Sequence, residues 1–164
     1  MPLLKGGDLI DDVWQKVGES DPLPADAPVI VTFKRWQAER EMLIGRNAPV
    51  GVRVPNNQDV APLAADLDRI GVIVLEFPIF KDGRAYSQAR LLRERYGYKG
   101  ELRASGQVLR DQLLFMHRCG FDAFEIAKGD PVAAWKAAIG EFSVFYQPPT
   151  KDGRVAVETL RRGA

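Results

Sequence analysis

Five short segments with strand patterns alternate with amphipathic stretches along the chain. The segments begin at Val29, Val50, Val72, Leu102 and Phe121, and in the fourth of them apolar Leu102 and Ala104 alternate with Arg103 and Ser105. Between them, apolar residues recur at steps of three and four, which is typical of helices with one buried face. This alternation predicts parallel strands joined by right-handed helical crossovers, and therefore an α/β protein.

Several predicted helices have recognisable ends. Thr32 is a suitable N-cap for a helix that runs towards Gly45, and Asp130 followed by Pro131 caps a last helix. The other helices are expected over 59–70, from about Arg84 to Gly97, and from Leu109 to Gly120. The run 72–77 is almost continuously apolar, as in a strand covered on both faces, so we expect it in the middle of the sheet.

These elements predict a single α/β domain of about five strand–helix units with a mainly parallel sheet. The sheet is either open and doubly wound or curved like part of a barrel, because both architectures share the same local pattern. Residues 1–28 contain many Gly and Pro residues and are expected to be an N-terminal arm with one short ordered piece around 9–17. The α/β domain then spans 29–146, and residues 147–164 are expected to be a C-terminal tail.

Composition narrows the class of protein. The chain has 164 residues, of which 46% are hydrophobic, enough for one sizeable core. Its 23 Lys and Arg residues are balanced by 22 Asp and Glu residues, so the charge indicates neither nucleic acid nor a membrane surface as a partner. No apolar segment is long enough to span a membrane, and Cys119 is the only cysteine, so we expect a cytoplasmic protein without internal disulfides.

The turn after the third predicted strand is the first candidate for a binding site. Asp82, Gly83, Arg84 and Ser87 lie where a strand passes into a helix, and a guanidinium, a hydroxyl and free backbone N–H groups can bind an anion there. The alternative is that Asp82 caps the helix and Arg84 pairs with a nearby carboxylate. Both interpretations stay open from the sequence.

The next predicted strand offers a second cation. Alternation places Glu101, Arg103 and Ser105 on one face, and Gly106 permits the close approach of a ligand. The alternative for Arg103 is a buried ion pair with Glu101 or Glu125.

The site hypothesis joins these residues at one rim of the sheet. We expect Arg84 and Arg103 to point there at a small anionic ligand, with Glu76 or Glu125 as the base if the protein is an enzyme. The same two carboxylates and Glu101 fall on consecutive strands, but each has a simpler use in an ion pair, so no metal site is predicted.

Two further residues lie on a flank of the predicted helix that begins near Arg84. Tyr86 and Arg93 either join the site, form a contact between subunits, or pack with the arginine stem over the tyrosine ring. The usual nucleotide-binding and hydrolase fingerprints are absent, so the sequence identifies no cofactor and no catalytic residue.

Three stretches of the sequence resemble a known bacterial family, domain of unknown function 934. They are FPIFKDGRAYSQARLLR from Phe77, YKGELRASG from Tyr98, and the segment from Asp111 to Phe124. Members of that family are typically encoded beside sulfite reductase and often carry the label "probable oxidoreductase". The resemblance therefore implies a role in sulfate assimilation.

Three functional hypotheses follow. The first is an accessory protein of assimilatory sulfite reduction that binds a small oxyanion or docks on sulfite reductase. The second is a small barrel-like α/β enzyme that acts on an anionic substrate, and the third is a dimeric adaptor whose contact uses the flank of Tyr86 and Arg93 together with the C-terminal tail.

Overall fold

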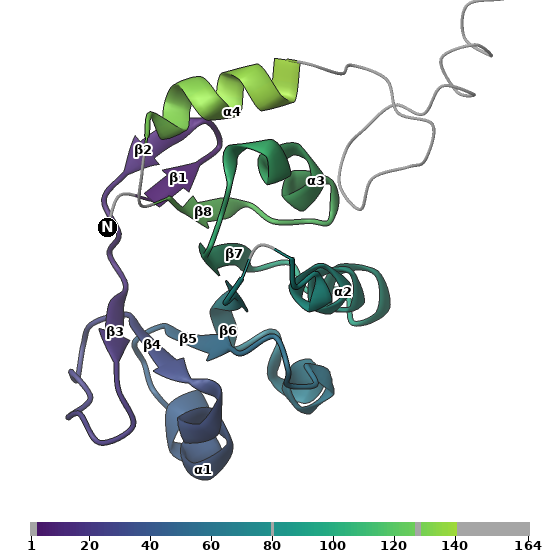
Figure 1. Ribbon diagram of the computed structural model, residues 1–164. Coiled ribbons are helices and arrows are strands. Elements are labelled where there is room, and N and C mark those ends of the chain that lie inside the picture. The colour runs from purple at the N-terminus through teal and green to yellow at the C-terminus, as the bar shows by residue number, and fades with distance from the viewer. Residues whose placement is uncertain (1–2, 80, 127–128, 141–164) are drawn as a thin grey trace, which may run out of the picture.

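The protein folds around one curved β-sheet. The structure, a computed structural model, describes residues 3–79, 81–126 and 129–140 (Figure 1). Within these residues eight strands form a sheet in the order β2-β1-β8-β7-β6-β5-β4-β3. The strands are β1 (Leu3–Lys5), β2 (Asp8–Ile10), β3 (Gln15–Val17), β4 (Val29–Thr32), β5 (Val50–Val54), β6 (Ile70–Phe77), β7 (Glu101–Gly106) and β8 (Ala123–Glu125).

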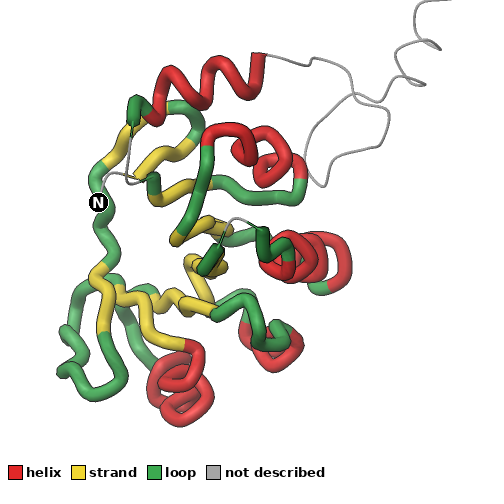
Figure 2. The backbone as a smooth tube through the Cα atoms, viewed as in Figure 1, coloured by secondary structure: helices red, strands yellow, loops and turns green. Residues whose placement is uncertain are grey.

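Helical segments follow most of the parallel strands and cover the outer side of the sheet, as Figure 2 shows in red. They are α1 (Phe33–Ile44), the 3-10 segment η1 (Ala61–Asp66), α2 (Arg84–Arg90) with its π-helical continuation η2 (Leu91–Arg95), the 3-10 turn η3 (Arg110–Gln112), α3 (Leu113–Arg118) and α4 (Pro131–Gly140).

The order of the strands decides between the two predicted architectures. Strands β4 to β8 are parallel neighbours in chain order, and the sheet curves into a half-barrel with its helices on the convex side (Figure 1). A doubly wound sheet would reverse its strand order part-way and carry helices on both faces. The partial-barrel alternative is therefore confirmed, and the open doubly wound alternative is wrong.

The sheet is mixed, which corrects the prediction of a mainly parallel one. Strand β1 pairs antiparallel with both β2 and β8, and β3 pairs parallel with β4. All three added strands come from residues 3–17, where the sequence predicted an arm. Each is only three residues long, so it carries no periodic signal of its own and is defined by its pairing partners.

The expected helix over 59–70 is also corrected. The structure has the short 3-10 segment η1 instead, with Leu63 N–H donating to the Val60 carbonyl three residues before it, and Ile70 already starts β6. The apolar stripe that suggested the helix is real, because Val60 and Leu63 are fully buried. Only the helix type and length differ.

Other local predictions are confirmed. The Thr32 hydroxyl accepts a hydrogen bond from the Arg35 N–H at 3.2 Å and caps α1. Asp130 accepts from the N–H groups of Val132 and Ala133 and caps α4. Strand β6 pairs on both sides, with β5 and with β7, in the middle of the sheet.

Two apolar clusters fill the two sides of the sheet. The larger one lies beneath the convex helices, and the smaller one consists of Ile30, Val72 and Val74 on the concave side, with Trp14 packed against it. Residues 11–14, here called the crossing segment, lead from β2 at one edge of the sheet to β3 at the other (Figure 1). The concave side is therefore partly covered by the chain itself.

The predicted tail at 147–164 lies outside the described residues. Among the helices that the structure does describe, none has the length and apolar character needed to pass through a bilayer.

Candidate functional site

Charged side chains from six strands and the crossing segment meet on the concave side of the half-barrel. Alternation along β7 explains why they gather there, since Glu101 and Arg103 face the concave side while Leu102 and Ala104 enter the larger core. The concave charge cluster has four cations and four carboxylates: Lys5, Lys16, Arg53, Arg103, Asp12, Glu76, Glu101 and Glu125.

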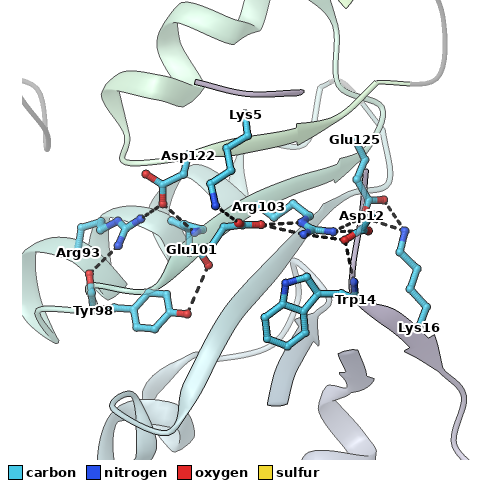
Figure 3. A network of polar contacts seen from close by, with 11 residues as sticks. Lys5, Asp12, Trp14, Lys16, Arg93, Tyr98, Glu101, Arg103, Asp122 and Glu125 are labelled. Carbon is cyan, nitrogen blue, oxygen red and sulfur yellow. Dashed lines mark hydrogen bonds and ion pairs between the residues drawn. The ribbon is translucent and has the colours of Figure 1, made fainter. Parts of the chain in front are cut away.

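Arg103 is the most deeply buried member of this cluster, with a side chain that is 0% exposed. It donates to the Glu101 carboxylate from Nε at 3.0 Å and from Nη2 at 2.8 Å, and to Asp12 from Nη1 at 2.7 Å and from Nη2 at 3.2 Å (Figure 3). Glu125 lies 3.6 Å from Nη1. These contacts use all three guanidinium nitrogens, so Arg103 has a structural role here.

The pairing keeps both partners ionised. Burial favours the neutral form of each group, but the hydrogen bonds and charges outweigh it, raising the pKa of Arg103 and lowering that of Asp12. Lys5 and Lys16 neutralise the outer carboxylates, with Lys5 Nζ 2.6 Å from Glu101 and Lys16 Nζ 2.8 Å from Glu125.

The crossing segment is attached to the sheet beside Arg103. Trp14 N–H donates to Asp12 Oδ1 at 3.2 Å, and the Trp14 ring packs on the smaller apolar cluster. Its close approach needs the glycine at position 71, where a Cβ atom would lie 2.9 Å from Trp14 Cη2. Asp12 thus pairs with the Arg103 guanidinium, while Trp14 anchors the same segment on the smaller apolar cluster.

Arg53 occupies the same cross-strand row as Arg103 but is held much less tightly. Val74 of β6 pairs in register with Arg53 on one side and with Arg103 on the other. The Arg53 side chain is 34% exposed, with Nε 3.3 Å from Glu76 and Nη2 3.9 Å from Glu125. Neither contact is a hydrogen bond, and Nε is buried without a hydrogen-bond partner among the described residues.

Arg53 lines a cavity of about 440 Å³, here called the strand-end cavity. The cavity lies at the carboxyl ends of β4, β5 and β6, where ligands bind in α/β folds. Its polar lining includes Glu19, Thr32, Lys34, Gln37, Arg53 and Glu76. Lys34 and Glu19 form an exposed ion pair of 2.7 Å, and the N-terminus of α1 adds a partial positive charge.

Comparison with known protein families covers part of this region. A family model described as "Bacterial protein of unknown function (DUF934)" matches residues 51–156, more than half of the chain. The chain belongs to this family. No curated protein sequence matches it. The DUF934 match includes Arg53, Glu76, Arg103 and Glu125, whereas Asp12 lies outside it.

The turn at the start of α2 follows the alternative interpretation for its charged residues. Arg84, 60% exposed, donates to the Asp82 carboxylate from Nε at 2.9 Å and from Nη2 at 2.6 Å. These hydrogen bonds lower the pKa of Asp82 well below its usual range. Gly83 is the N-cap of α2, and Ser87 is exposed on that helix.

The structure does not bring the two predicted arginines together. Arg84 is exposed beside Asp82, whereas Arg103 is buried between Asp12 and Glu101, and they share no carboxylate among the described ion pairs. The rim hypothesis failed because Arg103 lies in the middle of its strand and leans towards residues that the crossing segment supplies.

Ser105 and Gly106 end β7 in different surroundings. Ser105 is buried and pairs in register with Glu76, next to the strand-end cavity. Gly106 has φ of 92°, and a Cβ atom there would lie 2.4 Å from the Phe77 carbonyl oxygen, so packing alone requires the glycine. Gly106 also lines a second, mainly apolar cavity of about 850 Å³ beside α4, with Arg110 at its wall. Ligand binding by Ser105 and Gly106 remains a prediction.

Tyr86 and Arg93 both have packing roles. The Tyr86 ring lies between Phe77 and Phe115, with ring centroids 5.0 and 4.7 Å away, and burial raises its pKa to about 12. The Arg93 side chain is only 5% exposed and donates to the Tyr98 carbonyl and to Asp122 (Figure 3). It also donates to the Gly100 and Gly120 carbonyls. A buried Arg93 offers nothing to a subunit contact in this conformation.

Cys119 and the acidic side chains are the remaining candidates for nucleophilic and metal chemistry. Cys119 is buried, and that burial raises the pKa of its thiol, as in a packed cysteine. Within residues 3–79, 81–126 and 129–140, no group of three or more His, Cys, Asp or Glu side chains is placed to hold a metal ion.

Sequence reasoning missed Arg53, Asp12 and Lys16. A signal for Arg53 was present, since it is the single charged residue in the apolar run Val50–Val54. Asp12 and Lys16 had no such signal, because their importance comes from the path of the crossing segment across the sheet.

Proposed function

We propose that this protein binds a small anionic ligand in the strand-end cavity and serves assimilatory sulfite reduction as an accessory protein. The observation that carries the proposal is the Arg53 guanidinium, which lines the cavity, is one-third exposed and makes no hydrogen bond to a described residue. The family resemblance supplies the pathway, and this guanidinium supplies the site.

Three features support Arg53 as the ligand-binding cation. It lies one residue before the carboxyl end of β5 and lines the cavity that a ligand can enter. A guanidinium offers paired N–H donors that match the oxygens of a sulfur oxyanion or a carboxylate. The first turn of α1 contains no acidic residue, so its dipole favours negative charge in the same cavity.

Isothermal titration with sulfite, sulfate and adenylylated sulfate tests the ligand. We expect heat with at least one of them, and we expect Arg53→Gln to abolish it. Arg90→Gln is the matched control, because Arg90 is an exposed arginine paired with Glu94 and does not line the cavity. No heat with any of the three, together with no capture of sulfite reductase, would remove the proposal.

The pathway needs a separate test in cells. A deletion strain grown on sulfate, sulfite or cysteine as the only sulfur source shows whether the block lies before or after sulfite. We expect growth on cysteine and impaired growth on sulfite, restored by the wild-type gene and not by the Arg53→Gln gene. Normal growth on sulfate and sulfite would contradict the role in sulfite reduction.

An enzyme remains the second candidate, and one observation favours it. Glu76 lies in the same cavity, 3.3 Å from Arg53 and 33% exposed, so a carboxylate and a guanidinium meet at one strand end. An enzyme would consume adenylylated sulfate in a timed assay, and Glu76→Gln would retain binding but lose turnover. Identical consumption by wild-type and Glu76→Gln protein would exclude Glu76 as a base.

The dimeric adaptor remains a prediction, and the described residues offer less of the contact surface that it requires. Arg93 is buried, and the C-terminal tail lies outside the described residues. Sedimentation equilibrium decides this point, because a strictly monomeric mass would count against any adaptor that works as a dimer.

A further inference from the structure

The strand-end cavity carries both signs of charge, which restricts its ligand. Arg53 and Glu76 lie deep in its lining, and Lys34 and Glu19 lie at the exposed rim. Two cations therefore face two carboxylates within one cavity of about 440 Å³. This balance differs from that of a cationic pocket built for an anion alone.

The Arg53–Glu76 pair is open on both sides. The two side chains lie 3.3 Å apart without the alignment of a hydrogen bond, and both are about one-third exposed. The Glu76 carboxylate accepts no hydrogen bond from any residue that the structure describes, just as the Arg53 guanidinium donates none. Donors of one group and acceptors of the other are thus available to the same ligand.

A ligand that is only an anion would bind less tightly here than an anion that also carries a cationic group. It would approach Arg53 with the Glu76 carboxylate only 3.3 Å from the same guanidinium, so it would leave Glu76 without compensation. A ligand with charges of both signs avoids this, because its cation replaces Arg53 as the partner of Glu76 while its anion replaces Glu76 as the partner of Arg53.

We infer that the ligand of the strand-end cavity is a small zwitterion, whose anionic group binds Arg53 and whose cationic group binds Glu76. This inference rests on the proposed function and names the class of ligand for that same site.

Matched probe pairs test the inference. Taurine differs from ethanesulfonate, and β-alanine from propionate, by one ammonium group at nearly constant size. We expect each zwitterion to bind about tenfold more tightly than its matched anion, the effect of one charge-assisted hydrogen bond. Titration of the full-length protein by calorimetry and by chemical-shift perturbation measures both affinities.

Variants connect the preference to the two residues. Glu76→Gln should remove the difference within each probe pair, and Arg53→Gln should abolish binding of all four probes. Arg90→Gln should behave as the wild type. Urea unfolding of each variant confirms that the protein tested is folded.

The outcomes separate this inference from the proposed function. Equal binding of a zwitterion and its matched anion overturns the zwitterion inference and leaves an anion site in place. A preference for the zwitterion that persists in Glu76→Gln also overturns it. No binding of any probe, together with no binding of sulfite, sulfate or adenylylated sulfate, overturns both.

Discussion

Arg53 and Arg103 stand in one row of the sheet, on either side of Val74, yet their surroundings differ completely. Arg103 is fully buried, with hydrogen bonds to Asp12 and Glu101. Arg53 is one-third exposed and has only loose ion pairs. The Glu125 carboxylate contacts both guanidinium groups, at 3.6 Å from Arg103 and 3.9 Å from Arg53.

The difference shows that the covering chain, rather than the strand, decides what an arginine does. Both residues alternate out of an apolar strand onto the concave face. The crossing segment brings Asp12 to Arg103, whereas Arg53, on the other side of Val74, borders the strand-end cavity. A buried charge must be paired, so Arg103 has a structural role and Arg53 is available for binding.

The largest effect should come from removing the buried guanidinium. Arg103→Met leaves Asp12, Glu101 and Glu125 short of a partner and should lower the free energy of unfolding by about 3–5 kcal/mol. Arg53→Met, its partner in the comparison, should cost no more than about 1 kcal/mol, as is usual for partly exposed pairs. Urea unfolding measures both, and equal losses would remove the distinction between the two arginines.

The second largest effect should come from removing the Trp14 ring, which anchors the crossing segment. Trp14→Ala removes the ring that packs on Ile30, Val72 and Val74, and should cost about 2–3 kcal/mol, less than for a fully buried tryptophan. Trp14→Phe keeps part of the apolar contact and should cost less. A loss below about 0.5 kcal/mol for Trp14→Ala, a value usual for surface substitutions, would show that Trp14 does not anchor the crossing segment.

Acid should lower the free energy of unfolding by protonating Asp12, the partner of Arg103. The Arg103 contacts overcome the effect of burial and lower the pKa of Asp12 below its unfolded value of about 3.9, so this stabilisation is complete above that value and is lost as the pH falls through the folded pKa. Asp12→Asn should therefore cost about 1–2 kcal/mol at pH 7, and the difference from wild type should shrink below about pH 4. A difference that stays constant down to pH 2.5 would contradict the linkage; urea unfolding across this range measures it.

The smallest effect should come from an arginine that has neither role. Arg90 forms an exposed i,i+4 pair with Glu94 at 3.0 Å, so Arg90→Ala should cost only about 0.3–0.5 kcal/mol. Thermal unfolding with and without 1 M salt checks this, because salt should remove most of the difference. A loss similar to that of Arg103→Met would mean that burial does not separate the arginines.

Much of the convex side could be predicted from the sequence. The caps at Thr32 and Asp130 and the central strand β6 depend on residues close in the chain, and the structure confirms them. The concave side could not be predicted in the same way. Alternation correctly placed Arg103 and Glu101 on one face, but the partner Asp12 lies 91 residues away along the chain.

The sequence by itself determined the α/β class and the five parallel strands of the centre, because local periodicity and capping specify strands and helices. Its motifs, rather than its periodicity, indicated the family. Only the tertiary structure decided the curvature, the three short strands at the edges and the identity of the open arginine. Three-residue strands and cross-sheet ion pairs have no local signature, since the contacts that stabilise them join residues far apart in the chain.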